Sequence, residues 1–345
     1  MAAATEALDV AAVDPWLKGQ VPGLRGTPKV TQYSGGASNW TYRLEYENRD
    51  LVLRRPPAGT KARSAHDMAR EHGIQQALKP HYPVVPTMVA LCQDPAVLGC
   101  DFYVMERIDG LIPRKQLPRG LVLDAAQTRA LCLSVLDRLV ELHRVDFRAA
   151  GLAHLYKGEG YVQRQLSGWT ERYAKARTWN VATFASVTRW LQERAPKDKP
   201  PCVIHNDWRF DNVVLDPQEP TRVVGVLDWE LATVGDPLME LGSALAYWVE
   251  AKDGLFMQLG RRQPTHLPGM LTRAEVVEYY LAKTGLTTDD WAFYEVFGLF
   301  RLAGIAQQIY FRYHHGQSRN PAFRFFWVLI NSLAWRCRAV MRTAR

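Results

Sequence analysis

The stretches VIHNDWRFDNVVLD, residues 203–216, and VVGVLDWE, residues 223–230, decide how this chain is interpreted. Each begins with a short apolar run typical of a buried strand and ends in polar residues. Asp207 stands five residues before Asn212, and Asp228 follows the second apolar run. Carboxylate and amide oxygens are the ligands that Mg²⁺ takes in proteins. The pattern therefore indicates phosphoryl transfer, which needs metal ligands and a separate group to orient the attacking hydroxyl.

Each of these residues has a simpler explanation when taken alone. Asp207 could be a turn residue bonded to its own backbone, Asn212 an ordinary loop amide, and Asp228 a cap at the end of a strand. All three at this spacing make chance a poor explanation. His205 is expected to brace the loop from behind.

The composition is that of a globular protein long enough for two lobes, with 345 residues of which 47% are hydrophobic and 23% charged. No apolar run approaches the ~18 residues of a membrane helix. Glu6, Asp9 and Asp14 stand where a secretory signal would carry positive charge. The five cysteines are scattered without a C-x-x-C pair, so we expect neither disulfides nor a zinc site. A cytoplasmic protein without membrane insertion is the expectation.

The formal net charge of +8 favours an anionic small-molecule partner. A solvated basic surface would give the same number. The chain carries no signature of a nucleic-acid-binding module, so no nucleic-acid partner is expected. Nothing in the composition indicates an oligomeric state.

The order of predicted elements divides the chain into a mainly β part, residues 1–108, and a mainly helical part, residues 109–345. Proline and glycine punctuate the first part, and Ser64 is expected to cap a helix that runs to about Lys79. Asp124 and Asp236 are expected to cap helices in the second part. The expected strands are 29–33, 41–46, 51–55, 102–106, 203–204, 212–215 and 223–227, and a further helix is expected around Val162, Leu166, Trp169 and Tyr173.

The motif His205-x-Asp207-x4-Asn212, followed by Asp228, resembles the catalytic and metal-binding loops of the protein-kinase fold. Asp-Trp-Glu at 228–230 is similar to the aminoglycoside phosphotransferase and choline kinase superfamily. The nearest likeness is to the branch related to phosphotransferase domains fused to acyl-CoA dehydrogenases. Segments 35–39, 52–56, 102–106 and 300–304 share this likeness, so it covers nearly the whole chain.

The resemblance implies an α+β, protein-kinase-like bilobal fold and a kinase that uses ATP and Mg²⁺. Asp207 would orient or deprotonate the acceptor hydroxyl, and Asn212 and Asp228 would hold the metal. Arg209 stands two residues after Asp207, where protein kinases carry a phosphate-contacting lysine. Aminoglycoside enzymes often lack that cation, so a solvated arginine stays open as the alternative. Arg54 falls where kinases place a phosphate-contacting lysine. Arg keeps the charge but changes its hydrogen-bond geometry.

The resemblance also implies a nucleotide site in the first part of the chain. Glu71 lies on an apolar helix face and needs a partner, which is Arg54, or Arg55 if the strand register differs by one residue. The other implied contacts are backbone groups of Glu106 and Ile108 for adenine, and Gly35, Gly36, Ser38 and Asn39 over the phosphates.

Only seven residues separate Asp228 from Asp236, which leaves no room for a segment that docks peptides and favours a small-molecule acceptor. Arg301 and Arg312 are the candidate acceptor contacts. The fused relatives imply an acceptor connected with fatty-acid breakdown, such as a hydroxyacyl-CoA. Two alternatives stay open: an aminoglycoside-phosphorylating resistance enzyme, and a nucleotide-binding pseudokinase without catalysis.

Overall fold

A computed structural model describes residues 7–33, 39–57 and 67–344. The chain forms two compact units. The first comprises the residues up to Gly110 together with Val224–Ala232, and the second comprises Leu111–Val223 and Thr233–Arg345. The segment Val224–Ala232, which carries Asp228, is therefore part of the first unit although it lies far along the chain.

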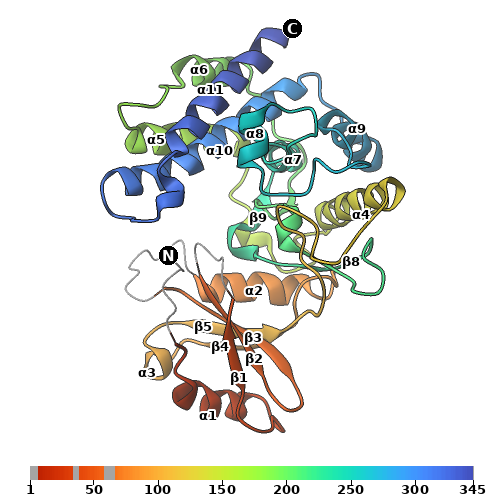
Figure 1. The fold of residues 1–345 in the computed structure, drawn as a ribbon, viewed down its shortest axis with the longest axis vertical. Coiled ribbons are helices and arrows are strands. Elements are labelled where there is room, and N and C mark those ends of the chain that lie inside the picture. Colours follow the sequence, from red (N-terminus) through yellow and green to blue (C-terminus); the bar gives the residue numbers. More distant parts are fainter. Residues whose placement is uncertain (1–6, 34–38, 58–66, 345) are drawn as a thin grey trace. The chain divides into compact units, whose positions relative to one another are not determined.

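The first unit is built on a five-stranded antiparallel sheet with strand order β1-β2-β3-β5-β4 (Figure 1). Four strands lie where the sequence predicts them, to within a residue. The strand β4 was not predicted, because prolines flank it and its pairing is interrupted between Met88 and Ala90. The bounds are β1 Lys29–Gln32, β2 Trp40–Glu45, β3 Asp50–Arg55, β4 Met88–Cys92 and β5 Phe102–Glu106.

Helices α1 (Val10–Gln20) and α2 (Met68–Leu78) contribute to different apolar clusters on the sheet. Side chains alternate across a strand. Leu51 and Leu53 of β3 accordingly pack in the cluster with α1, whereas Val52 packs in the cluster with Met68 of α2. The short helix α3 (Pro95–Leu98) contacts α1.

One prediction for these helices was wrong, and one of the two helices was not predicted. The residue that caps α2 is Asp67, whose side chain accepts from the Arg70 N–H, and not Ser64, which lies outside the described residues. Helix α1 was not predicted, since Pro15 lies inside it and weakens the local helical signal.

The second unit is mainly helical (Figure 1). Asp124 caps α4 through a capping box with Gln127, and Asp236 caps α7 ahead of Pro237, as the sequence predicts. Strand β6 (Cys202–Ile204) pairs with β9 (Thr233–Gly235), and β7 covers Val213–Leu215. The helices are α4 Ala125–His143, α5 Tyr161–Ala176, α6 Ala185–Glu193, α7 Pro237–Leu245, α8 Leu255–Gly260, α9 Arg273–Thr284, α10 Trp291–His314 and α11 Phe326–Thr343.

Helices α7 and α10 approach each other closely because both carry glycine at the crossing. A Cβ atom on Gly298 would lie 2.0 Å from the carbonyl oxygen of Gly242, and one on Gly242 would lie 2.3 Å from that of Tyr294. Any larger residue would have to push the helices apart. The close crossing brings two side chains to the loop that follows β6. Glu240 of α7 and Arg301 of α10 both form hydrogen bonds to the backbone of that loop.

No helix in the described part of the chain is both long and apolar enough to cross a membrane. All five cysteines are free thiols.

Candidate active site

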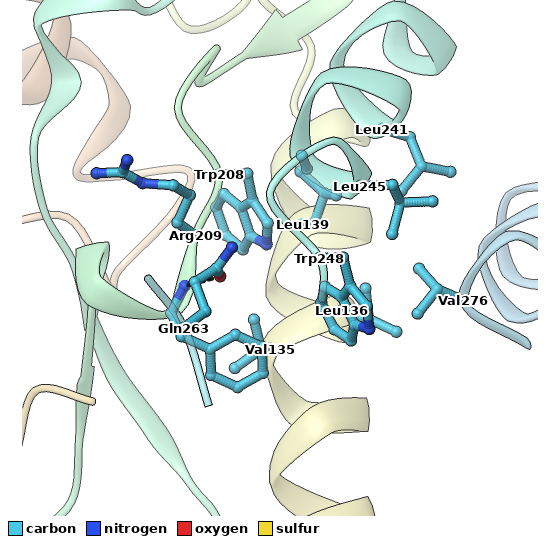
Figure 2. A pocket seen from close by; sticks show the side chains of 12 residues that line it. Val135, Leu136, Leu139, Trp208, Arg209, Leu241, Leu245, Trp248, Gln263 and Val276 are labelled. Atoms are coloured by element: carbon cyan, nitrogen blue, oxygen red, sulfur yellow. Dashed lines mark hydrogen bonds between the residues drawn. The ribbon is translucent and has the colours of Figure 1, made fainter. Parts of the chain in front are cut away.

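The loop that carries Asp207 is held in place by buried side chains that alternate with an outward-pointing one along an extended segment. Trp208 and Phe210 are 5% and 1% exposed, and they line a small cavity together with side chains of α4 and α7. Figure 2 shows Trp208 among these side chains. The intervening Arg209 has an extended backbone (φ −152°, ψ 159°), so its side chain points the other way, as Figure 2 shows. The cavity between these apolar side chains measures about 10 Å³, room for one water at most. Tight packing thus anchors the loop and leaves Asp207 and Arg209 outside the core.

Asp207 and Asn212 are joined directly. The Asn212 amide nitrogen donates to the Asp207 backbone carbonyl at 2.8 Å and to its carboxylate Oδ2 at 3.1 Å. Because the nitrogen is occupied in this way, the amide oxygen is the atom left for a further contact, and it makes no hydrogen bond within the described chain. An amide oxygen is a donor that Mg²⁺ accepts.

Arg209 is held between two carboxylates. Its Nη2 lies 3.3 Å from Asp207 Oδ2, and its Nε lies 3.0 Å from Asp211 Oδ1. The guanidinium carbon also lies 5.1 Å from the centroid of the Tyr247 ring, within the range of a cation–π contact. Arg209 is therefore an ordered neighbour of Asp207, which disfavours its interpretation as a solvated side chain.

A buried carboxylate on α7 supports the loop from beneath. Glu240, 1% exposed, accepts the backbone N–H groups of His205 at 3.1 Å and Asn206 at 2.5 Å. His143 of α4 contacts the same carboxylate at 2.7 Å, and the Tyr280 hydroxyl contacts the other His143 ring nitrogen at 2.5 Å. Burial disfavours the charged form, but His143, His205 and the Asn206 N–H together outweigh it and hold the pKa of Glu240 below its ordinary value. Sequence reasoning missed this residue, although a single carboxylate in the apolar helix PLMELGSAL was a usable signal.

Two further contacts fix the backbone just before Asp207. Asn206 adopts a left-handed conformation with φ of 66°, and its carbonyl accepts from Arg301 Nη2 at 2.8 Å. His205 is wholly buried, and its Nδ1 accepts the Asp207 N–H at 3.3 Å, in keeping with a bracing role.

Arg312 is exposed on α10, eleven residues or about 16 Å beyond Arg301 on the same helix face.

The first unit contains its own cluster of charges around Arg54. Its Nη1 lies 3.2 Å from Glu71 Oε1, and its Nη2 lies 3.1 Å from Asp228 Oδ1 and 3.7 Å from Glu230 Oε2. Arg55 points to the opposite face of β3, where its guanidinium lies 4.7 Å from the centroid of the Trp40 ring. The strand register therefore pairs Glu71 with Arg54. Burial, only partly offset by the Arg54 charge, raises the pKa of Glu71.

Asp228 is held in an unusual backbone conformation. Its φ of 68° and ψ of 62° are left-handed, which is uncommon outside glycine and concentrates at functional sites. Trp229 is fully buried and its indole N–H donates to the Val226 carbonyl, so the following turn is anchored. Asn39 is also placed here, with its amide donating to Glu230 Oε2 at 3.0 Å.

The expected adenine and phosphate contacts are described only in part. The Glu106 N–H donates to the Thr87 carbonyl at 2.8 Å, so a ligand could use only the Glu106 carbonyl. Ile108 follows at the end of β5, and its N–H has no hydrogen-bond partner among the described residues. Gly35, Gly36 and Ser38 lie outside the described residues.

The family model for the phosphotransferase enzyme family (APH) matches residues 29–294 of this chain. The chain belongs to this family, and the resemblance noted from its motifs is confirmed.

Curated relatives extend the same likeness. The chain is 33% identical over 333 residues to mouse acyl-CoA dehydrogenase family member 10, covering 96% of this chain and 31% of the relative. It is 32% identical over 312 residues to human acyl-CoA dehydrogenase family member 11, covering 89% of this chain and 39% of the relative. The chain thus spans between three and four tenths of the length of these relatives.

Solved structures confirm the kinase-like α+β fold. A candidate aminoglycoside phosphotransferase of Ralstonia eutropha JMP134 is 29% identical, with a TM-score of 0.82 and coverage of 98% of this chain and 99% of the other. Choline kinase of Cryptosporidium parvum Iowa II is 11% identical, with a TM-score of 0.65 and 96% of both chains covered. At this lower identity the likeness concerns the fold alone.

The Arg54–Glu71 pair provides a test of the cluster of charges around Arg54 in the first unit. Glu71→Ala should destabilise the protein by about 3–5 kcal/mol, because it leaves a buried guanidinium with one carboxylate fewer. Combining it with Arg54→Met should cost less than the two changes added together. Urea unfolding of the four proteins in a double-mutant cycle measures this coupling.

The matched control is the cycle between Glu71 and Arg55, which lies on the other face of β3 and should show additive changes. Coupling at position 55 equal to that at position 54 would contradict the pairing.

Proposed function

We propose that this chain is an ATP- and Mg²⁺-dependent kinase that phosphorylates a hydroxyl group of a small molecule. The observation that carries the proposal is the Asn212 side chain, whose nitrogen is committed to Asp207 while its oxygen is left for a metal. Membership of the phosphotransferase family supports the transfer chemistry.

In the proposed reaction Asp207 accepts the proton of the acceptor hydroxyl. The hydroxyl oxygen forms a bond to the γ-phosphorus of ATP, the bond from that phosphorus to the β–γ bridging oxygen breaks, and ADP leaves with the electron pair. The Asp207 carboxylate is suited to this role, since the Asn212 amide fixes its orientation and Arg209 stabilises its charge. Arg209 could also contact the phosphoryl group in transit.

Asn212 and Asp228 are the proposed metal ligands, through an amide oxygen and a carboxylate. When bound, Mg²⁺ would neutralise charge on the phosphates. Arg54 now faces Glu71, Asp228 and Glu230, so it is surrounded by carboxylates. This arrangement suits a cation that also contacts the nucleotide phosphates, as proposed for Arg54, with Glu71 holding it in place.

The remaining proposed nucleotide contacts are backbone and small polar groups. The Ile108 N–H, which has no hydrogen-bond partner in the described part of the chain, and the Glu106 carbonyl would bind adenine. Gly35, Gly36, Ser38 and Asn39 would lie over the phosphates.

The proposed acceptor is anionic, and a hydroxyacyl-CoA fits best. The net charge of +8 would attract such a molecule. Arg301 lies next to the loop that carries Asp207, and Arg312 is about 16 Å farther along the same face of α10. This spacing suits an extended acceptor with a hydroxyl near Asp207 and negatively charged groups along α10 as far as Arg312. The curated relatives that include acyl-CoA dehydrogenases in their names support the same class.

The role of Asp207 can be separated from nucleotide binding. Asp207→Asn should lower the turnover number by about 10²–10⁴-fold, the usual contribution of a positioned base. The affinity for ATP should stay nearly unchanged, because Asp207 is proposed to act on the hydroxyl. Equal losses of turnover and ATP affinity would rule out this assignment. Steady-state kinetics and calorimetric titration with ATP provide the two measurements.

The role of Asp228 can be tested through the metal. Asp228→Ala removes the single carboxylate of the proposed metal ligands and should abolish the tightening of ATP binding by Mg²⁺. Titration with ATP is carried out with and without Mg²⁺, and Asp211→Ala serves as a control acidic change. A normal Mg²⁺ effect in Asp228→Ala would place the metal elsewhere.

The acceptor class is tested by direct comparison. At matched ATP and Mg²⁺, a hydroxyacyl-CoA should be phosphorylated, and raised salt should weaken the reaction because screening reduces attraction of the anion. Kanamycin-like polycations should react little or not at all. ³¹P NMR identifies the phosphorylated product. Robust aminoglycoside turnover with an inert hydroxyacyl-CoA panel would favour the resistance enzyme, and no phosphorylation of any acceptor would favour the pseudokinase.

A further inference from the structure

Three side chains of the second unit form a compact cationic cluster beside the loop that carries Asp207. Trp169 and Arg172 come from α5, and Arg301 comes from α10. The Arg172 guanidinium carbon lies 4.2 Å from the centroid of the Trp169 ring, and the Arg301 guanidinium carbon lies 5.5 Å from it. Both distances are within the range of a cation–π contact, so two cations share one indole.

The charges of this cluster are not balanced by carboxylates. Arg301 is only 7% exposed, yet its one hydrogen bond in the described chain goes to a neutral acceptor, the Asn206 carbonyl. Arg172 forms no ion pair among the residues 7–33, 39–57 and 67–344. Its neighbour Glu171 pairs with Lys175 at 2.5 Å instead. Arg172 is exposed and can be solvated, but Arg301 is buried, and a buried guanidinium group is normally paired because removing an isolated charge from water is costly.

The electrostatic consequence is visible at Arg172. Burial lowers the pKa of its guanidinium, and the positive charge of Arg301 lowers it further. A structural cation–π contact needs one cation, so the second Arg adds repulsion without improving the packing. A bound anion would remove both the repulsion and the missing pairing.

The indole of Trp169 packs closely against α10. A Cβ atom on Gly304 would lie 2.9 Å from Trp169 Cε3, so the absence of a side chain at this position lets the ring rest against α10. The buried Trp169 indole N–H has no hydrogen-bond partner in the described chain. The cluster therefore combines an aromatic ring packed against α10 with two cations that have no carboxylate partner among the described residues. It lies next to Asn206, the residue that precedes Asp207.

We propose that Arg172 and Arg301, stacked on Trp169, form a subsite that binds an anionic group of the acceptor, either a phosphate or a carboxylate. The inference rests on the kinase function proposed above and specifies which acceptors it accepts. Guanidinium groups bind both anions through paired N–H donors. The bond from Arg301 to Asn206 links this subsite to the catalytic loop, so anion binding would help to place the hydroxyl at Asp207. Polycationic acceptors would be repelled.

The anion could come from two sources. In a hydroxyacyl-CoA it would be a phosphate of the coenzyme. In a free hydroxy acid it would be the carboxylate. A hydroxyacyl-pantetheine has the same acyl chain and hydroxyl but carries neither group, and it serves as the neutral reference.

The test compares Arg172→Ala with Lys175→Ala. Both variants lose one positive charge from α5, but only the first disturbs the cluster, and Lys175 is an exposed residue in a surface ion pair of little energetic value. Arg172→Ala should raise KM for the charged acceptor by about 10-fold or more, the worth of a charged hydrogen bond. KM for the neutral pantetheine thioester, and the melting temperature without ligand, should change little. Arg172→Lys should restore binding only in part, since Lys cannot pair with an anion in the bidentate manner.

A binding arm makes the result independent of turnover. Protein saturated with AMP-PNP and Mg²⁺ is titrated calorimetrically with coenzyme A and, separately, with the free hydroxy acid. Arg172→Ala should weaken binding of at least one of them by about 10-fold, and the affected ligand identifies the source of the anion. Arg301→Lys, which keeps the charge near Asn206, should weaken the same ligand.

The outcomes separate the two proposals. Binding that depends on Arg172 without phosphorylation of any acceptor would support the subsite and contradict the kinase function. Phosphorylation with the same KM in wild type, Arg172→Ala and Lys175→Ala would overturn the subsite and leave the kinase function in place. Absence of any binding that depends on Arg172 would also overturn it.

Discussion

The Glu240 carboxylate is almost wholly buried, and it accepts two successive backbone N–H groups of the loop that carries Asp207. A buried charge is tolerated only where its hydrogen bonds are made, so the loop cannot shift without exposing an unpaired carboxylate to an apolar core. His143 and Tyr280 complete the network from α4 and α9. The glycine crossing of α7 and α10 then sets how close Arg301 comes to the same loop. The position of the loop that carries Asp207 in the second unit therefore depends on one carboxylate.

The arginines of the two units have opposite charge environments, where the small unit is the first unit and the large unit is the second. Arg54 in the small unit faces three carboxylates, Glu71, Asp228 and Glu230, and is over-supplied with negative charge. Such a cluster suits the proposed site for a nucleotide with its metal, since the added cation restores the balance. Arg172 and Arg301 in the large unit have no carboxylate partner among the described residues, which suits an anionic acceptor. The proposed specificity thus follows from where charges are left unpaired, and net charge alone would not locate it.

Much of this could be predicted from the sequence, because the informative features are local. The spacing of Asp207, Asn212 and Asp228 indicated the chemistry, and the resemblance carried by these motifs identified the family, which the comparisons confirm. Helix caps at Asp124 and Asp236 and the alternating strands of the first unit were also predicted, since capping and side-chain alternation depend on neighbouring residues only. Elements with prolines inside or beside them, α1 and β4, were missed because their local signal is weak and packing stabilises them.

The sequence by itself thus determined the family and the fold class, and it singled out the loop that carries Asp207 as the candidate catalytic loop. The tertiary structure decided which arginine meets Glu71, because that choice depends on the register of β3 and on the face that α2 covers. It also brought Glu240 to His143, 97 residues away, and Arg301 to the ring of Trp169 on another helix. Contacts of this kind leave no periodic pattern in a single chain, since each partner satisfies its own local structure equally well without the other.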